Sequence, residues 1–190
     1  MAEAGAPAAR CRLYLSAPAA LPTDFAATLA AVLAAGDVAC LRLSPGPDIR
    51  PLVDLAQAHA CAVVLDGRPD LVEDLGADGV HLGNLADYEN TRRLLGGAAS
   101  IGVFCDSSRH LAMEASEAGA DYVAFAPDLD LVTWWGELMV VPVVVELGND
   151  LDRAADYIAA SADFICPGEA LWYDREGAAA AVRKLAGLMG

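Results

Sequence analysis

A fourfold repeat constrains the fold of this sequence more than any other feature. An aspartate opens each of four short apolar segments, at residues 37–41, 78–82, 121–125 and 163–166, in steps of 41, 43 and 42 residues. Each aspartate follows two small residues (AG, GA, GA or SA), which are typical of the turn from a helix into a strand. One period has room for two strand–helix units. Four periods in 190 residues therefore predict a single α/β domain, a (β/α)8 TIM barrel.

Local patterns place individual elements within this scheme. Asp48 has the chemistry of a helix N-cap, so the second helix is expected to open there. Residues 143–147 are mostly β-branched, which is typical of a strand buried on both faces. The segment 127–141 must hold both a loop and a helix, and this predicts a short sixth helix.

The composition indicates one domain and excludes several classes of partner. No linker divides the chain, so we expect a flexible tail at 1–11 and the barrel at 12–190. The longest near-apolar stretch, 25–35, is too short to span a bilayer, and the first ten residues lack the apolar core of a signal peptide, which predicts a cytoplasmic protein. The net charge of −15 disfavours nucleic acid and anionic membranes as partners.

Candidate site residues follow from the predicted fold, because the loops after the strands carry the chemistry of such barrels. Among the residues at these positions, the candidates are Arg42, Asp66, Arg68, His81, Asn84, Asp106, Glu146 and Glu169. The two arginines either bind an anion or form internal ion pairs, for instance with Asp66 or Glu146. His81 is either a hydrogen-bonded wall residue or a ligand contact.

Several segments also resemble one known family. Residues 76–84 (GADGVHLGN) resemble the run GADGVHLGQ of the thiamin phosphate synthase family, and 66–71 (DGRPDL) is similar to its NDRxDL. The resemblance extends over about residues 12–171, in a superfamily that also contains the TenI thiazole tautomerases. It implies a (β/α)8 barrel that joins a pyrimidine-methyl diphosphate to a thiazole phosphate and expels pyrophosphate with the help of Mg²⁺.

The resemblance carries site roles onto this chain residue by residue. Arg42 matches the arginine of a Q-x-R-x-K run that neutralises the diphosphate. The two magnesium-binding carboxylates of the family align with Gly67 and Ala86, so Asp66 and Asp87, one position away, are the candidate ligands.

Other family positions hold different residues here. Cys40 and Ser44 replace the glutamine and lysine beside Arg42, and Glu146 and Glu169 stand where the family binds a phosphate. At 4 Å and an effective dielectric of 20, repulsion between unit charges costs about 4 kcal/mol, so these carboxylates are expected to oppose an anion.

These departures favour a non-catalytic or regulatory ligand-binding barrel. One alternative is an enzyme of changed chemistry, with Asp66, Asp106 or Glu146 as general base on a heterocycle of thiamin metabolism. The other is a working thiamin phosphate synthase. No cofactor is assigned, apart from Mg²⁺ if synthase activity is retained. The expected partner is a small heterocyclic molecule or none, and association into a homo-oligomer is left open.

Overall fold

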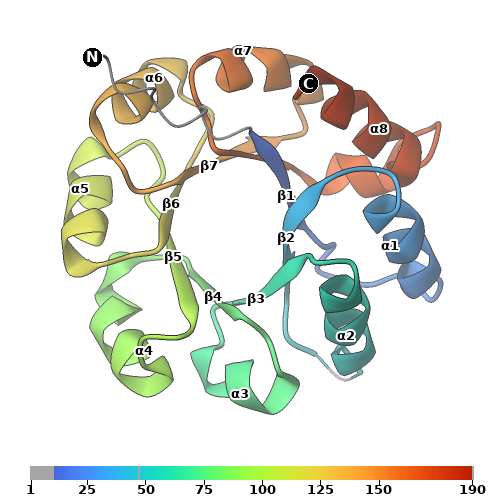
Figure 1. Ribbon diagram of the computed structural model, residues 1–190, viewed down its shortest axis with the longest axis horizontal. Helices are drawn as coiled ribbons and strands as arrows, with labels where there is room; N and C mark the ends of the chain where they lie inside the picture. The colour runs from blue at the N-terminus through green and yellow to red at the C-terminus, as the bar shows by residue number, and fades with distance from the viewer. Residues whose placement is uncertain (1–10, 47, 190) are drawn as a thin grey trace, which may run out of the picture.

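The structure is a closed barrel of parallel strands surrounded by helices (Figure 1). This computed structural model describes residues 11–46 and 48–189. The strands are β1 (Arg12–Ser16), β2 (Val38–Leu43), β3 (Ala62–Asp66), β4 (Gly79–Leu82), β5 (Ser100–Phe104), β6 (Tyr122–Phe125), β7 (Val143–Gly148) and β8 (Phe164–Pro167). They follow one another around the barrel in chain order, and β8 pairs with β1. The predicted (β/α)8 fold is confirmed.

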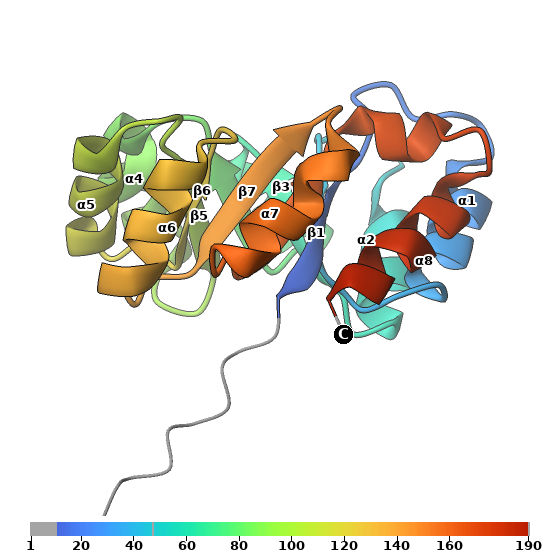
Figure 2. The same ribbon diagram turned by 90° about the horizontal axis from the view of Figure 1, so that it is seen from above.

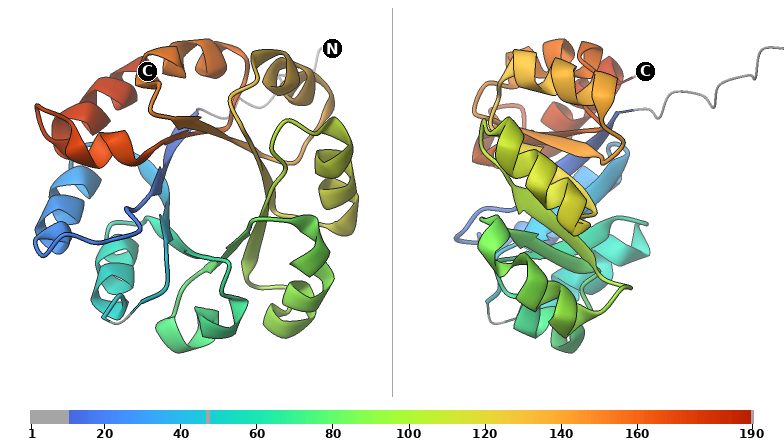
Figure 3. Two further views of the ribbon diagram at one scale, coloured as in Figure 1. Left: turned by 180° about the vertical axis from the view of Figure 1, so that it is seen from behind. Right: turned by 90° about the vertical axis from the view of Figure 1, so that its left-hand side faces the viewer.

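A layer of helices covers the outside of the barrel on all sides (Figures 2 and 3). The α-helices are α1 (Phe25–Leu33), α2 (Arg50–Ala58), α3 (Val72–Leu75), α4 (Tyr88–Leu95), α5 (Arg109–Ala118), α6 (Leu129–Leu138), α7 (Ala154–Ala159) and α8 (Ala178–Leu188). Short 3-10 helices are η1 (Pro69–Leu71), η2 (Leu85–Asp87), η3 (Leu151–Arg153) and η4 (Glu169–Tyr173). Within the described residues, no helix is both long and apolar enough to cross a membrane.

The repeated aspartates join neighbouring strands at the amino-terminal rim of the barrel. Each of them directly precedes an even-numbered strand. Three of their carboxylates accept a hydrogen bond from a backbone amide of the preceding strand: Val63 to Asp78 (2.7 Å), Ile101 to Asp121 (2.8 Å) and Val143 to Asp163 (2.8 Å). The fourth, Asp37, binds the Arg12 guanidinium of β1 at 2.7 and 2.9 Å. The sequence repeat is therefore a repeated strand-to-strand contact.

The strands send alternate side chains inward and outward, as the period of two requires. The inward-facing buried cluster consists of Tyr14, Val64, Tyr122, Ala124, Val144 and Cys166. The outward-facing side chains, for example Leu13 and Leu15, join the larger core beneath the helices. The barrel interior thus contains two tyrosine hydroxyls, and burial requires that each find a hydrogen-bond partner.

Two local expectations are wrong, and a third lies mostly outside the described residues. Asp48 adopts a left-handed conformation (φ 63°) and does not cap α2, which begins at Arg50 with Pro51 fixing its first turn. Helix α6 is ten residues long, because the loop before it is short and Asp128 caps it by accepting the Leu131 amide at 3.0 Å. Of the predicted tail, residues 1–10 lie outside the described part and Cys11 is buried.

The rim aspartates are expected to stabilise the barrel. Asp78→Ala removes the acceptor of the buried Val63 amide and should lower the free energy of unfolding by about 1–3 kcal/mol. Asp54→Ala is the control, since Asp54 forms an exposed pair with Arg50 and should change stability by about 0.5 kcal/mol or less. Urea unfolding followed by circular dichroism measures both. Equal losses would contradict this role.

Candidate functional site

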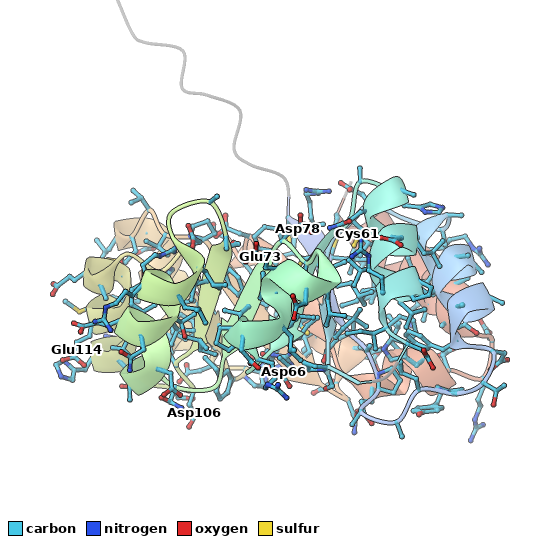
Figure 4. All side chains as sticks on the ribbon, turned by 90° about the horizontal axis from the view of Figure 1, so that it is seen from below. Cys61, Asp66, Glu73, Asp78, Asp106 and Glu114 are labelled. Carbon is cyan, nitrogen blue, oxygen red and sulfur yellow. The ribbon has the colours of Figure 1, made fainter. Side chains whose placement is uncertain are left out.

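The candidate site residues stand at the carboxyl-terminal rim of the barrel. Figure 4 shows Asp66 and Asp106 at this rim, with Asp78 and Cys61 at the opposite one. The two ends of the parallel strands therefore separate the predicted chemistry from the rim aspartates that hold the strands together.

A partly buried ion pair between Arg42 and Glu146 lies at the mouth. Arg42 is on β2 and Glu146 on β7, and Arg42 Nη1 lies 2.8 Å from Glu146 Oε1. The exposed fractions of the two side chains are only 15% and 23%. Arg42 Nε and Nη2 also donate to Ser16 Oγ, each at 3.3 Å. Burial is the largest single effect and acts to lower the pKa of Arg42, but the charge of Glu146, its hydrogen bond and the nearby Tyr14 and Cys166 together raise that pKa.

His81 lies directly beneath this pair. It is 2% exposed, and its Nε2 is 3.6 Å from Glu146 Oε1. Burial first, and then the positive charge of Arg42, lower the pKa of His81 to about 3. The imidazole is therefore neutral near pH 7, and its contact with Glu146 is not an ion pair.

Two tyrosines complete a polar chain inside the barrel. His81 Nδ1 is 3.0 Å from Tyr122 Oη, which is 2.9 Å from Tyr14 Oη. The Tyr122 ring lies against Gly102, where a Cβ atom would be only 1.9 Å from Tyr122 Cζ. Glycine at this position thus allows the ring to reach across to His81. The chain runs from β1 and β6 through β4 to the Arg42–Glu146 pair.

A second polar group lies at the ends of β3 and β4. Asn84 Nδ2 donates to Asp87 Oδ2 at 3.1 Å, and both line a cleft of about 440 Å³ together with Gly67. Asp66 ends β3 nearby in sequence and is exposed. Mg²⁺ commonly binds to one or two carboxylates plus substrate phosphates. Asp87 and Asn84 supply oxygens of this kind within the cleft, and Asp66 is a further exposed carboxylate at the end of β3.

A metal ion held by the protein alone does not fit this site. Across residues 11–46 and 48–189, no three histidine, cysteine, aspartate or glutamate side chains gather closely enough to bind one. The donor set at the cleft fits Mg²⁺ only when ligand oxygens complete the coordination.

The second predicted arginine is also paired internally. Arg68 donates to both carboxylate oxygens of Asp70, at 2.7 and 2.8 Å, and this bidentate pair is exposed. The hydrogen bond to Asp70 raises the pKa of Arg68. The sequence offered Asp66 and Glu146 as partners of the two arginines. Glu146 pairs with Arg42, whereas Arg68 pairs with Asp70 instead of Asp66.

Asp106 and Glu169 each contact a different loop residue. Asp106 adopts a left-handed conformation (φ 50°), and its carbonyl accepts the Ala126 amide at 3.2 Å. Glu169 Oε1 accepts the Ala19 amide at 3.2 Å and so links the loops after β8 and β1. Both Glu146 and Glu169 were expected to oppose a phosphate. Their partners differ, because the charge of Glu146 is neutralised by Arg42, whereas Glu169 accepts a hydrogen bond from a backbone amide.

Sequence reasoning missed Tyr14 and Tyr122 as partners of His81. Both stand in apolar strands, where an aromatic residue is more often core than site. The alternation of inward and outward side chains along each strand could have found them, because Tyr14, His81 and Tyr122 all stand at positions that face the barrel interior.

Comparison with known proteins identifies the family. The sequence model described as Thiamine monophosphate synthase matches residues 17–171. A protein of Rhodospirillum centenum named thiamine-phosphate synthase is 45% identical over 90% of this chain and 94% of its own length. This chain belongs to the thiamine monophosphate synthase family. A Hyphomonas neptunium protein of the same name is 35% identical over 96% of each chain.

Solved structures agree on the fold. The thiamine phosphate pyrophosphorylase of Pyrococcus furiosus superposes with a TM-score of 0.82 over 95% of this chain and 96% of that chain, at 23% identity.

The relatives overturn the expected function. The replaced positions favoured a non-catalytic or regulatory barrel, and that interpretation is wrong. Nearly full-length relatives at 35–45% identity are named as synthases, and nothing found indicates a pseudoenzyme. The replaced family positions do not by themselves decide the function, and Glu146, one of the carboxylates expected to oppose a phosphate, forms the ion pair with Arg42 that the sequence left open.

Neutral His81 gives a direct test of the site electrostatics. With its pKa lowered to about 3 by burial and by Arg42, the imidazole should keep the chemical shifts of the neutral form from pH 8 down to pH 5. NMR of the protein labelled with ¹³C-histidine measures these shifts, and the signal that disappears in the His81→Gln variant is assigned to His81. A titration midpoint near 6.5, the ordinary value, would contradict the geometry.

Proposed function

We propose that this protein is a thiamine-phosphate synthase, which joins a pyrimidine-methyl diphosphate to a thiazole phosphate and releases pyrophosphate. The observation that carries the proposal is the relationship to proteins named thiamine-phosphate synthase along nearly the whole chain. The structure supports it with a mouth that holds a buried guanidinium at the carboxyl ends of the strands, where barrel enzymes bind their substrates.

In this proposal, Arg42 neutralises the leaving diphosphate. The bond between the pyrimidine methylene and the diphosphate breaks as the thiazole takes its place, and negative charge accumulates on the departing oxygen. A guanidinium can donate two parallel hydrogen bonds to phosphate oxygens, and burial strengthens their effect. Arg42 is the arginine that faces the barrel interior, whereas Arg68 is exposed beside Asp70.

Asp66, Asp87 and Asn84 would hold the magnesium ion of the reaction, with substrate oxygens as the remaining ligands. The ion, when bound, supplies positive charge to the diphosphate. The chain's own contribution is orientation, since Asn84 holds Asp87 Oδ2 at 3.1 Å and fixes the direction of the carboxylate. Glu169, tied to the Ala19 amide, would close the side of the mouth between β8 and β1.

No observation favours the reading in which a carboxylate acts as general base. Glu146 is engaged by Arg42, and Asp66 and Asp106 are exposed. The buried, neutral His81 instead lies against Glu146, with its Nε2 atom 3.6 Å from Glu146 Oε1.

The purified protein should form thiamin phosphate from the two substrates with Mg²⁺, as detected by chromatography of the products. Arg42→Gln should lower kcat/KM by about 10²–10³, because one donor to the developing charge is lost. Arg50→Gln is the matched control, since Arg50 lies exposed on α2 and pairs with Asp54. Absence of product from the parent protein, or an equal loss in both variants, would refute the proposal.

A further inference from the structure

The hydrogen bonds of Arg42 leave it little capacity to bind an anion. A guanidinium has five N–H donors. Within the described residues, Arg42 makes four hydrogen bonds, two to Ser16 Oγ at 3.3 Å and two to Glu146 at 2.8 and 3.5 Å. One hydrogen on Nη1 remains. Two parallel bonds to a diphosphate therefore require that one of these acceptors leave.

Glu146 is the acceptor whose departure opens the mouth. It reaches Arg42 from β7, which is separated from β2 by β8 and β1 in the closed barrel. Its side chain thus spans part of the opening, whereas Ser16 stands on β1, directly beside β2. Glu146 also carries the charge that an incoming anion has to replace.

The carboxylate has a second partner within reach. His81 Nε2 lies 3.6 Å from the same Oε1 atom that binds Arg42. One arrangement of protons lets each of these hydrogen-bonded side chains donate to the next one toward the mouth. Tyr14 then donates to Tyr122, Tyr122 donates to His81 Nδ1, and His81 Nε2 donates to Glu146. A small movement of Glu146 would convert the 3.6 Å approach into a hydrogen bond.

We infer that Glu146 competes with the diphosphate for Arg42 and thereby sets how tightly the mouth holds it. In the free barrel, Glu146 occupies the guanidinium. When a diphosphate binds, its oxygens take that place and Glu146 turns to His81. The inference rests on the proposed function for the identity of the anion. It makes Glu146 a positioning residue that weakens the binding of pyrophosphate, the product that must leave.

Binding of inorganic pyrophosphate, measured by calorimetry with and without MgCl₂, tests the inference without requiring turnover. Glu146→Gln keeps the shape but removes the competing charge, so its Kd should fall by about tenfold or more. Glu146→Asp withdraws the carboxylate by one methylene while keeping its charge, and an intermediate gain is expected. This second variant applies if the glutamine variant does not fold, as thermal unfolding would show.

Two further variants show whether the effect acts through Arg42. Asp106→Asn removes one charge from the same rim, but Asp106 is exposed and Arg42 is bound by Ser16 and Glu146 instead, so the gain should stay below about threefold. Adding Arg42→Gln to Glu146→Gln should abolish the gain. The inference is overturned if Glu146→Gln binds no tighter than the parent, if Asp106→Asn gains equally, or if the double variant keeps the gain.

The synthase assay separates this inference from the proposed function. A parent protein that makes no thiamin phosphate, together with a Glu146→Gln variant that gains affinity, would refute the function and leave the role of Glu146 standing. If the parent makes thiamin phosphate but the Glu146→Gln variant binds pyrophosphate no tighter, the proposed function stands and the role of Glu146 is refuted.

Discussion

The need to pair a buried charge at the barrel mouth governs the arrangement of this site. Arg42 projects from β2 into an interior where its exposed fraction is 15%, and an unpaired guanidinium there would be strongly destabilising. Glu146 supplies the opposite charge from β7, and Ser16 accepts two further hydrogen bonds. His81 then has to be neutral, because burial and the adjacent Arg42 both disfavour its protonation. Tyr122 and Tyr14 follow, since the buried imidazole needs a partner of its own.

This pairing reconciles the acidic sequence with a family that handles phosphates. Counted along the sequence, the mouth has more carboxylates than arginines, and an anion should be repelled. In three dimensions, Asp70 is bound to Arg68 and Glu146 to Arg42, so these two carboxylates are each neutralised by an arginine. Under the proposed function, the anion site is present in a paired form, and an exchange of partners would make it available.

The sequence predicted the fold well because the repeat has a physical cause. An aspartate before each even-numbered strand binds the strand that precedes it, and such contacts recur once in every two strand–helix units. The site was predicted less completely. Sequence placed Arg42 and Glu146 at the same rim and offered their pairing as one alternative, but strands β2 and β7 are not adjacent in the barrel. The tilt of the strands and the reach of their side chains decide which residues meet across the opening, and the local sequence pattern does not determine these contacts.

A crystal structure of the protein with Mg²⁺ and pyrophosphate tests the Arg42–Glu146 exchange most directly. The exchange predicts that Arg42 donates to the pyrophosphate oxygens, that Glu146 no longer lies 2.8 Å from Arg42 Nη1, and that the Glu146 carboxylate contacts His81 Nε2. Pyrophosphate bound at the mouth with the Arg42–Glu146 pair intact would contradict it.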